Sequence, residues 1–105
     1  MSLKDRLATA TKEVIRWNIL RYVYSAKEVG VLDRIITQVM VTCEFDVTLA
    51  DIRGELHFLR GLGLVEIEAE RDVSIWVAKI TSDGTCVVEY AVPCPVGLSR
   101  PKQEW

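Results

Sequence analysis

Three cationic side chains in the middle of the chain are spaced to interact with a polyanion. Arg53, His57 and Arg60 stand at positions i, i+4 and i+7, which an α-helix presents as a stripe along one flank. The two guanidinium groups could contact phosphates or a guanine edge, and the imidazole could donate from one nitrogen or join when protonated. Gly54 lies on the outward line beside this stripe and would let a phosphate or another backbone come close. We therefore expect this helix to contact duplex DNA.

A second interpretation of the same helix stays open. Asp51 and Glu55 form an acidic stripe on its other flank. The two arginines could then belong to a solvated face and pair with Glu55 or with neighbouring acids. Ala50, Gly54, Phe58 and Gly61 are expected on the most outward line between the two stripes.

The start and the end of this helix are marked in the sequence. Thr48 is a good N-cap residue, and Asp51 follows three positions later, which is close to a capping box. The inner face is expected to consist of Leu49, Ile52, Leu56 and Leu59, and Gly61 and Gly63 end the helix. Thr48 is also among the expected DNA contacts.

The N-terminal region shows two apolar stripes at helical spacing. The first consists of Leu3, Leu7, Ala10, Val14 and Trp17, and the second of Ile15, Ile19, Tyr22, Val23 and Ala26, rotated by about 100°. We interpret residues 13–26 as the first core helix and the preceding residues as an arm. The first stripe needs burial, so the chain is predicted to form a homodimer through it. A second helix is expected over residues 31–43, where apolar residues recur at i, i+1, i+4 and i+5.

The remainder predicts a hairpin, a short helix and a tail. "LVEIE" and "VSIWVAKI" have the composition of two strands, with "AERD" as their turn. Residues 81–92 are expected to form a short helix capped by Thr81 or Ser82, and residues 93–105 an extended tail with prolines. The hairpin carries four acids against Arg71 and Lys79, which argues against ordinary contact between hairpin and DNA. Only Arg71, at the tip, is kept as a candidate contact.

These elements resemble a winged helix-turn-helix. "LHFLRGLGLVEIE" is similar to the junction between recognition helix and wing in ArsR-like and MarR-like regulators, with Leu56, Leu59, Gly63, Leu64 and Val65 at the matching positions. "AKITSDGT" is similar to their exit from the second wing strand. The whole chain, with its "VPCPVGLSRP" tail, resembles small winged-helix proteins of Mu-like phages and prophages, although Cys94 stands where a glycine is commoner. The resemblance implies an α+β, mainly α, winged-helix domain over residues 1–92 and a DNA-binding or regulatory role.

Charge, cysteine content and the missing motifs indicate which kinds of protein this chain can be. The 105 residues carry a net charge of −2, with +3 over residues 1–29 and −5 over residues 30–105, so only the first segment has a basic footprint. Three widely spaced cysteines favour a reducing compartment, and no apolar run is long enough to span a bilayer, so a cytoplasmic protein without a membrane partner is expected. We expect no enzyme, because the sequence has a single histidine and lacks a nucleophile motif and a phosphate loop. We expect no metal or cofactor site either, because the cysteines are scattered.

Two functions follow as hypotheses. The first is a small phage-type DNA-binding regulator that reads duplex DNA with its third helix. The alternative is an adaptor that keeps the fold but binds a phage protein through its acidic hairpin, for example in DNA packaging or assembly.

Overall fold

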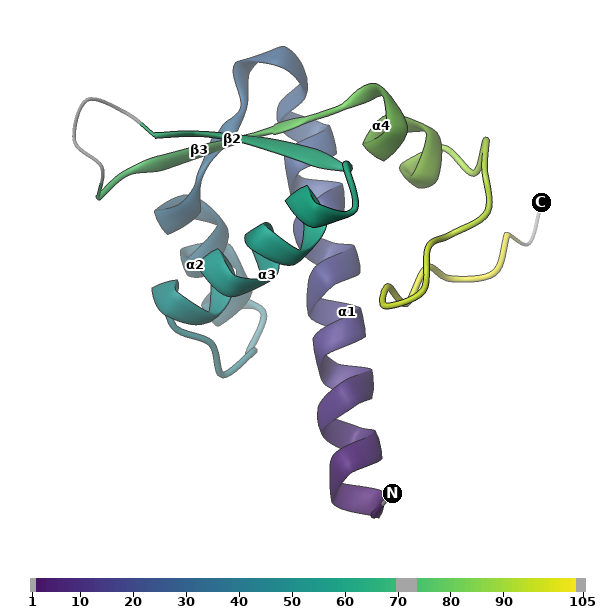
Figure 1. The fold of residues 1–105 in the computed structure, drawn as a ribbon. Helices are drawn as coiled ribbons and strands as arrows, with labels where there is room; N and C mark the ends of the chain where they lie inside the picture. The colour runs from purple at the N-terminus through teal and green to yellow at the C-terminus, as the bar shows by residue number, and fades with distance from the viewer. Residues whose placement is uncertain (1, 70–73, 104–105) are drawn as a thin grey trace.

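A long first helix runs through most of the N-terminal quarter of the chain. In the computed structural model, which describes residues 2–69 and 74–103, helix α1 (Leu3–Ala26) is continuous, with Ser2 as its N-cap. Residues 13–26, interpreted as the first core helix, are the packed half of α1, and the preceding arm is helical and continuous with them. The two apolar stripes lie on one unbroken helix, and only the second half of it is packed. Figure 1 shows the first half of α1 projecting away from the other elements.

The segment after α1 differs from the prediction of a helix starting at Val31. A short 3₁₀ turn (Lys27–Val29) is followed by strand β1 (Val31–Leu32), and helix α2 (Asp33–Thr42) begins after it. Gly30 permits this change of direction because it has a φ of +82°, and a Cβ there would lie 2.7 Å from Cγ1 of Val77. The apolar pair Val31 and Leu32 thus joins the sheet, not the helix.

The third helix agrees closely with the sequence pattern. Helix α3 (Leu49–Gly61) is N-capped by Thr48, and the capping box with Asp51 is complete. The Thr48 hydroxyl accepts from the Asp51 amide at 3.2 Å, and the Asp51 carboxylate accepts from the Thr48 amide at 2.9 Å. Ile52, Leu56 and Leu59 are fully buried, as the predicted inner face requires.

A small antiparallel sheet follows α3. Strands β2 (Val65–Ala69) and β3 (Trp76–Ile80) pair with Val65 opposite Ile80, which confirms the two predicted strands. The sheet has a third strand that was not predicted, because β1 pairs with the other edge of β3, giving the order β1-β3-β2. The predicted turn, including Arg71, lies outside the described residues.

The C-terminal part consists of one short helix and an irregular segment. Helix α4 (Ser82–Val88) is capped by Thr81 and ends four residues earlier than predicted, before Tyr90 with its φ of +60°. Residues 91–103 contain no regular secondary structure, but they return to α1. Leu98 is buried, and the Ser99 amide donates to the carbonyl of Glu13 at 3.2 Å.

The architecture is α+β and mainly helical. Over the described residues, four α-helices and the three-stranded sheet share one apolar core. The core is centred on the second half of α1, the inner faces of α2 and α3, and Ala78 of β3. This arrangement leaves α3 at the surface, directly followed by the hairpin.

Candidate functional site

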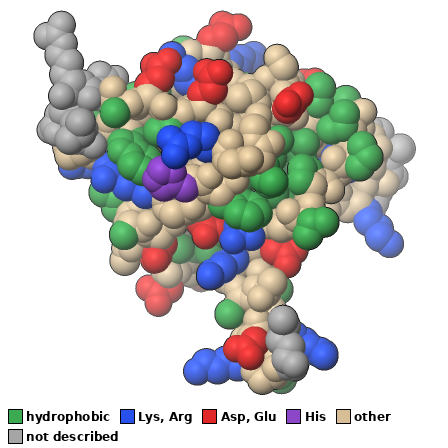
Figure 2. Space-filling view, viewed as in Figure 1, with side chains coloured by type: hydrophobic (Ala, Val, Ile, Leu, Met, Phe, Trp, Pro, Cys, Tyr) green, Lys and Arg blue, Asp and Glu red, His purple; other side chains and the backbone are tan. Residues whose placement is uncertain are grey.

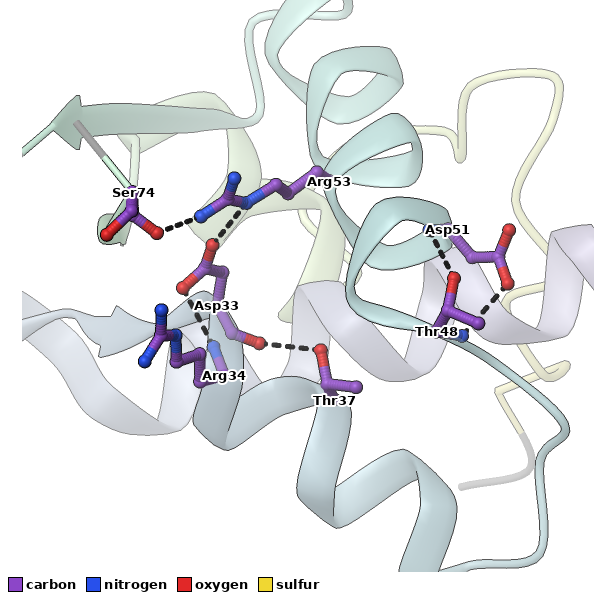
Figure 3. A network of polar contacts seen from close by, with 7 residues as sticks. All are labelled: Asp33, Arg34, Thr37, Thr48, Asp51, Arg53 and Ser74. Atoms are coloured by element: carbon purple, nitrogen blue, oxygen red, sulfur yellow. Dashed lines mark hydrogen bonds and ion pairs between the residues drawn. The ribbon is translucent and has the colours of Figure 1, made fainter.

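Arg53 does not stand free on the surface of α3. Its Nε donates to Oδ2 of Asp33 at 2.6 Å, and the Asp33 side chain has no exposed area. A further guanidinium nitrogen donates to the carbonyl of Ser74, and the group lies over the Trp76 ring at 4.7 Å (Figure 3). Arg53 therefore ties α3 to the start of α2 and to the hairpin, and the expectation of a pairing with neighbouring acids describes it better than that of a free DNA contact.

Asp33 is the buried acid of this cluster. It is the first residue of α2, and its Oδ1 accepts from the amide of Arg34 at 2.8 Å while its backbone carbonyl accepts from the Thr37 hydroxyl. A carboxylate that is removed from water needs such partners, because the desolvation of an unpaired ion costs several kcal/mol. Nothing in the sequence pattern singled out Asp33, since it lies within an apolar segment that predicted a helix face.

His57 and Arg60 form the exposed part of the predicted cationic stripe. An Nη of Arg60 lies 2.7 Å from Nδ1 of His57, and the His57 ring meets the Trp76 ring edge-on at 4.9 Å between centroids. Both residues are exposed. Figure 2 shows the histidine, in purple, next to a basic side chain on the face that α3 presents to the viewer. The stripe is thus split into a sequestered member, Arg53, and an accessible pair.

Glu55, on the acidic flank of α3, is neutralised from α1. Arg16 donates through Nε to Oε2 of Glu55 at 2.5 Å, and both side chains are 16% exposed. The Arg16 guanidinium also lies 3.8 Å from the centre of the Phe58 ring and donates to the carbonyl of Gly97 at 3.2 Å. Sequence reasoning placed Phe58 on the outward line of α3. The structure instead covers it with Arg16 and the C-terminal segment.

Gly97 is the point at which the C-terminal segment lies against α3. It has a φ of +106°, and a Cβ on it would lie 2.6 Å from Cζ of Phe58. We expect Gly97→Ala to loosen this segment and to lower the free energy of unfolding by about 1–3 kcal/mol, because both the backbone and the contact become strained. Hydrogen exchange of the Ser99 amide, which is bonded to α1, should become faster. Unchanged exchange at Ser99 would contradict the assigned contact.

One face of α3 remains open. Ala50, Gly54, His57, Arg60 and Gly61 are exposed. A Cβ on Gly54 or Gly61 would meet no atom within 4 Å, so the backbone itself can be approached there. Over the last two turns of α3 this face carries no acidic side chain, because Glu55 is turned toward Arg16. Thr48, also expected to contact DNA, is exposed, but its hydroxyl is used by the capping box.

A groove separates the first half of α1 from the start of α3. It has a volume of about 480 Å³, and its walls are formed by one face of α1 and by the loop and first turns of α3. The lining includes Ala8, Thr11 and Ile15 on one side and Ala50 and Gly54 on the other. The sequence analysis did not predict this groove, since it arises from the relative placement of two helices.

The five residues predicted to mediate dimerisation divide into two groups. Leu3 is 73% exposed, Leu7 60% and Val14 38%, and Ala10 is exposed beside them. Trp17, in contrast, is buried in the core of its own chain and packs edge-on near Tyr90. Trp17 is therefore a core residue, and the accessible stripe is formed by Leu3, Leu7, Ala10 and Val14.

Two tyrosine hydroxyls on α1 have raised pKa values. Burial, followed by a hydrogen bond with the Cys43 thiol, raises the pKa of Tyr22, and the hydrogen bond to Glu89 at 2.6 Å is the main cause that raises the pKa of Tyr24. Both shifts favour the neutral phenol, so neither hydroxyl is prepared to act as a base or nucleophile near neutral pH.

The described residues also bear on a metal site and on a membrane span. Within residues 2–69 and 74–103, no group of three His, Cys, Asp or Glu side chains is placed to hold a metal ion. In the same part of the chain, no helix combines the length and the apolar character needed to cross a bilayer.

The chain was compared with protein families, curated proteins and solved structures. No protein-family model, curated protein sequence or solved structure matches the chain.

Proposed function

We propose that this chain is a small winged-helix DNA-binding protein of the regulator type, in which the C-terminal half of α3 contacts the duplex. The observation that carries the proposal is the open face of α3, which combines the His57–Arg60 pair with approachable backbone at Gly61. The order of elements supports it, because α2 and α3 are followed at once by the β2–β3 hairpin, as in a helix-turn-helix with a wing.

Local electrostatics support DNA contact better than the net charge suggests. Two acids that border α3, Asp33 and Glu55, are each paired with an arginine of the same chain. A phosphate that approaches His57 and Arg60 therefore does not meet an unpaired carboxylate from either of them. Since phosphate contacts dominate the affinity of DNA-binding proteins, this local balance matters more than the charge of the whole chain.

The proposal predicts a salt-dependent interaction with DNA that depends on Arg60. Fluorescence anisotropy with a labelled duplex should show binding that weakens steeply between about 50 and 200 mM salt. Arg60→Ala should weaken binding and reduce the slope of log K against log salt by about 1, because one phosphate contact is lost. Arg21→Ala, which removes an exposed arginine from α1, is the matched control and should keep the slope.

Two results would overturn this function. One is the absence of any anisotropy change at micromolar protein and low salt. The other is an equal slope for the Arg60 and Arg21 variants, which would show that binding does not pass through α3. Arg53→Ala cannot make this distinction, because the loss of its ion pair with Asp33 is expected to affect folding.

A second candidate function is favoured by the hairpin. Strand β2 is an outer strand of the sheet, and its Glu66 and Glu68 are exposed. Glu68 lies 3.2 Å from Lys79 of the neighbouring strand. An outer strand can accept an added strand from an extended peptide, and the acids favour a basic one. An adaptor role in which a basic segment of another protein pairs with β2 becomes the better proposal where DNA binding is absent.

A further inference from the structure

The first half of α1 carries an apolar surface that its own chain does not cover. Leu3 and Leu7 are 73% and 60% exposed, and Val14 continues the stripe toward the body. This part of the helix projects from the fold (Figure 1), so the leucines lie in water along a free helical rod. Isolated helices of this length are marginal in water and are normally stabilised by packing of their apolar face.

The groove between α1 and α3 lies on the neighbouring face of the same helix half. At about 100° per residue, Thr11 stands between Leu7, on the stripe, and Ala8, in the groove. The stripe and the groove therefore border each other along this half of α1. The opposite wall is built from the small residues Ala50 and Gly54, which allow a second backbone to come close.

The charges of the groove and of the projecting helix are complementary. Asp46 and Asp51 line the groove with exposed side chains, and Lys12 is the cation of the lining. Glu55 lines it too, but its carboxylate is already paired with Arg16. The projecting half of α1 carries Lys4, Arg6 and Lys12 against two acids, whereas the rest of the chain is acidic. The same chain therefore presents both a basic apolar helix and an acidic groove of small residues.

We propose that the groove is occupied by the projecting helix of a second copy of this chain, and that two copies exchange these helices reciprocally. In an antiparallel pair about a twofold axis at the level of Ala8 to Ala10, the second copy's Lys4 and Arg6 come to the level of residues 12–14, beside the groove. Such a symmetric exchange buries the same patch on both chains. It covers Ala50 and Gly54 but leaves His57, Arg60 and Gly61 open.

Sedimentation velocity of the full chain without DNA, over a concentration series, tests the exchange. We expect a monomer–dimer equilibrium in which Leu7→Ser raises the dissociation constant by about 100-fold, because each of the two leucines loses its burial. Ile35→Ser removes a side chain of similar exposure, 51%, from α2 and should leave the constant unchanged.

A matched pair of glycine variants tests the groove itself. Gly54→Gln fills the groove and should raise the dissociation constant by at least about tenfold, as a loss of close packing predicts. Gly61→Gln, on the same helix and equally open, should have no effect. A chain that stays monomeric at every concentration, or a dimer indifferent to Leu7→Ser, overturns the proposal. Equal effects of the two glutamine variants would show that the second copy does not occupy the groove, and this result would also overturn the proposal. None of these results depends on DNA binding.

Discussion

Replacing Arg53 with alanine is expected to lower the free energy of unfolding by about 3–5 kcal/mol, the cost of breaking a buried ion pair by removing one partner. The carboxylate of Asp33 is fully buried, and the Arg53 guanidinium is its charge partner at 2.6 Å. Without Arg53, this carboxylate must stay charged without a counterion, take up a proton, or draw water into the core. The variant also loses the link to the Ser74 carbonyl and to the Trp76 ring, which hold the hairpin beside α3.

Urea unfolding of a double-mutant cycle measures this pair. Asp33→Ala alone should cost less than Arg53→Ala, because the arginine side chain, which is 24% exposed, can turn toward water. The double variant should be more stable than the sum of the single effects predicts, by at least about 1 kcal/mol. Arg34→Ala is the control, since it removes a neighbouring exposed arginine and should change stability by less than about 0.5 kcal/mol.

A small effect of Arg53→Ala would contradict this account. If the loss stays below about 1 kcal/mol, the pair behaves like a surface ion pair, and Arg53 becomes available again as a DNA contact. If the loss is large, reduced DNA binding by an Arg53 variant reports on folding and cannot by itself assign a contact.

The case of Arg53 shows how far the sequence could predict the site. Helical periodicity placed Arg53, His57 and Arg60 on one flank of α3 and Asp51 and Glu55 on the other, and the buried face of Ile52, Leu56 and Leu59 confirms that geometry. Periodicity gives directions around one helix axis, but it does not say which element lies beside each flank. The partners Asp33 and Arg16 are 20 and 39 residues away in sequence, so the ion pairs could not be predicted.

Local signals explain which parts of the fold were predicted correctly. The capping box at Thr48 and the cap at Thr81 involve residues three positions apart, and both are confirmed. Strand β1 was missed because two apolar residues, Val31 and Leu32, fit a helical stripe equally well, and only pairing with β3 decides between the alternatives. The course of residues 91–103 depends on tertiary contacts with α1 and Phe58. The prolines and the glycine of this segment indicate that it is irregular, but they do not predict which elements it contacts.

Gly84→Ala is expected to lower the free energy of unfolding by about 3 kcal/mol, at the upper end of ordinary overpacking effects. Gly84 stands in the first turn of α4, where a Cβ would lie 2.1 Å from the carbonyl oxygen of Leu64 and 2.7 Å from Cδ1 of Ile80. The carbonyl is backbone and cannot turn away, since it accepts from the Thr81 amide at 3.2 Å. Relief requires α4 to move away from the α3–β2 junction.

The same substitution at Gly54 provides a control of opposite sign. Gly54 is also a helical glycine, but a Cβ there meets nothing within 4 Å, so at concentrations where the chain is monomeric Gly54→Ala should stabilise it by about 1 kcal/mol through helix propensity alone. Thermal unfolding should then separate the two variants clearly, because each kcal/mol shifts the midpoint by about 4–8 °C in a domain of this size. Equal midpoints for the two variants would show that α4 does not pack on the Leu64 carbonyl, because helix propensity alone would raise both equally.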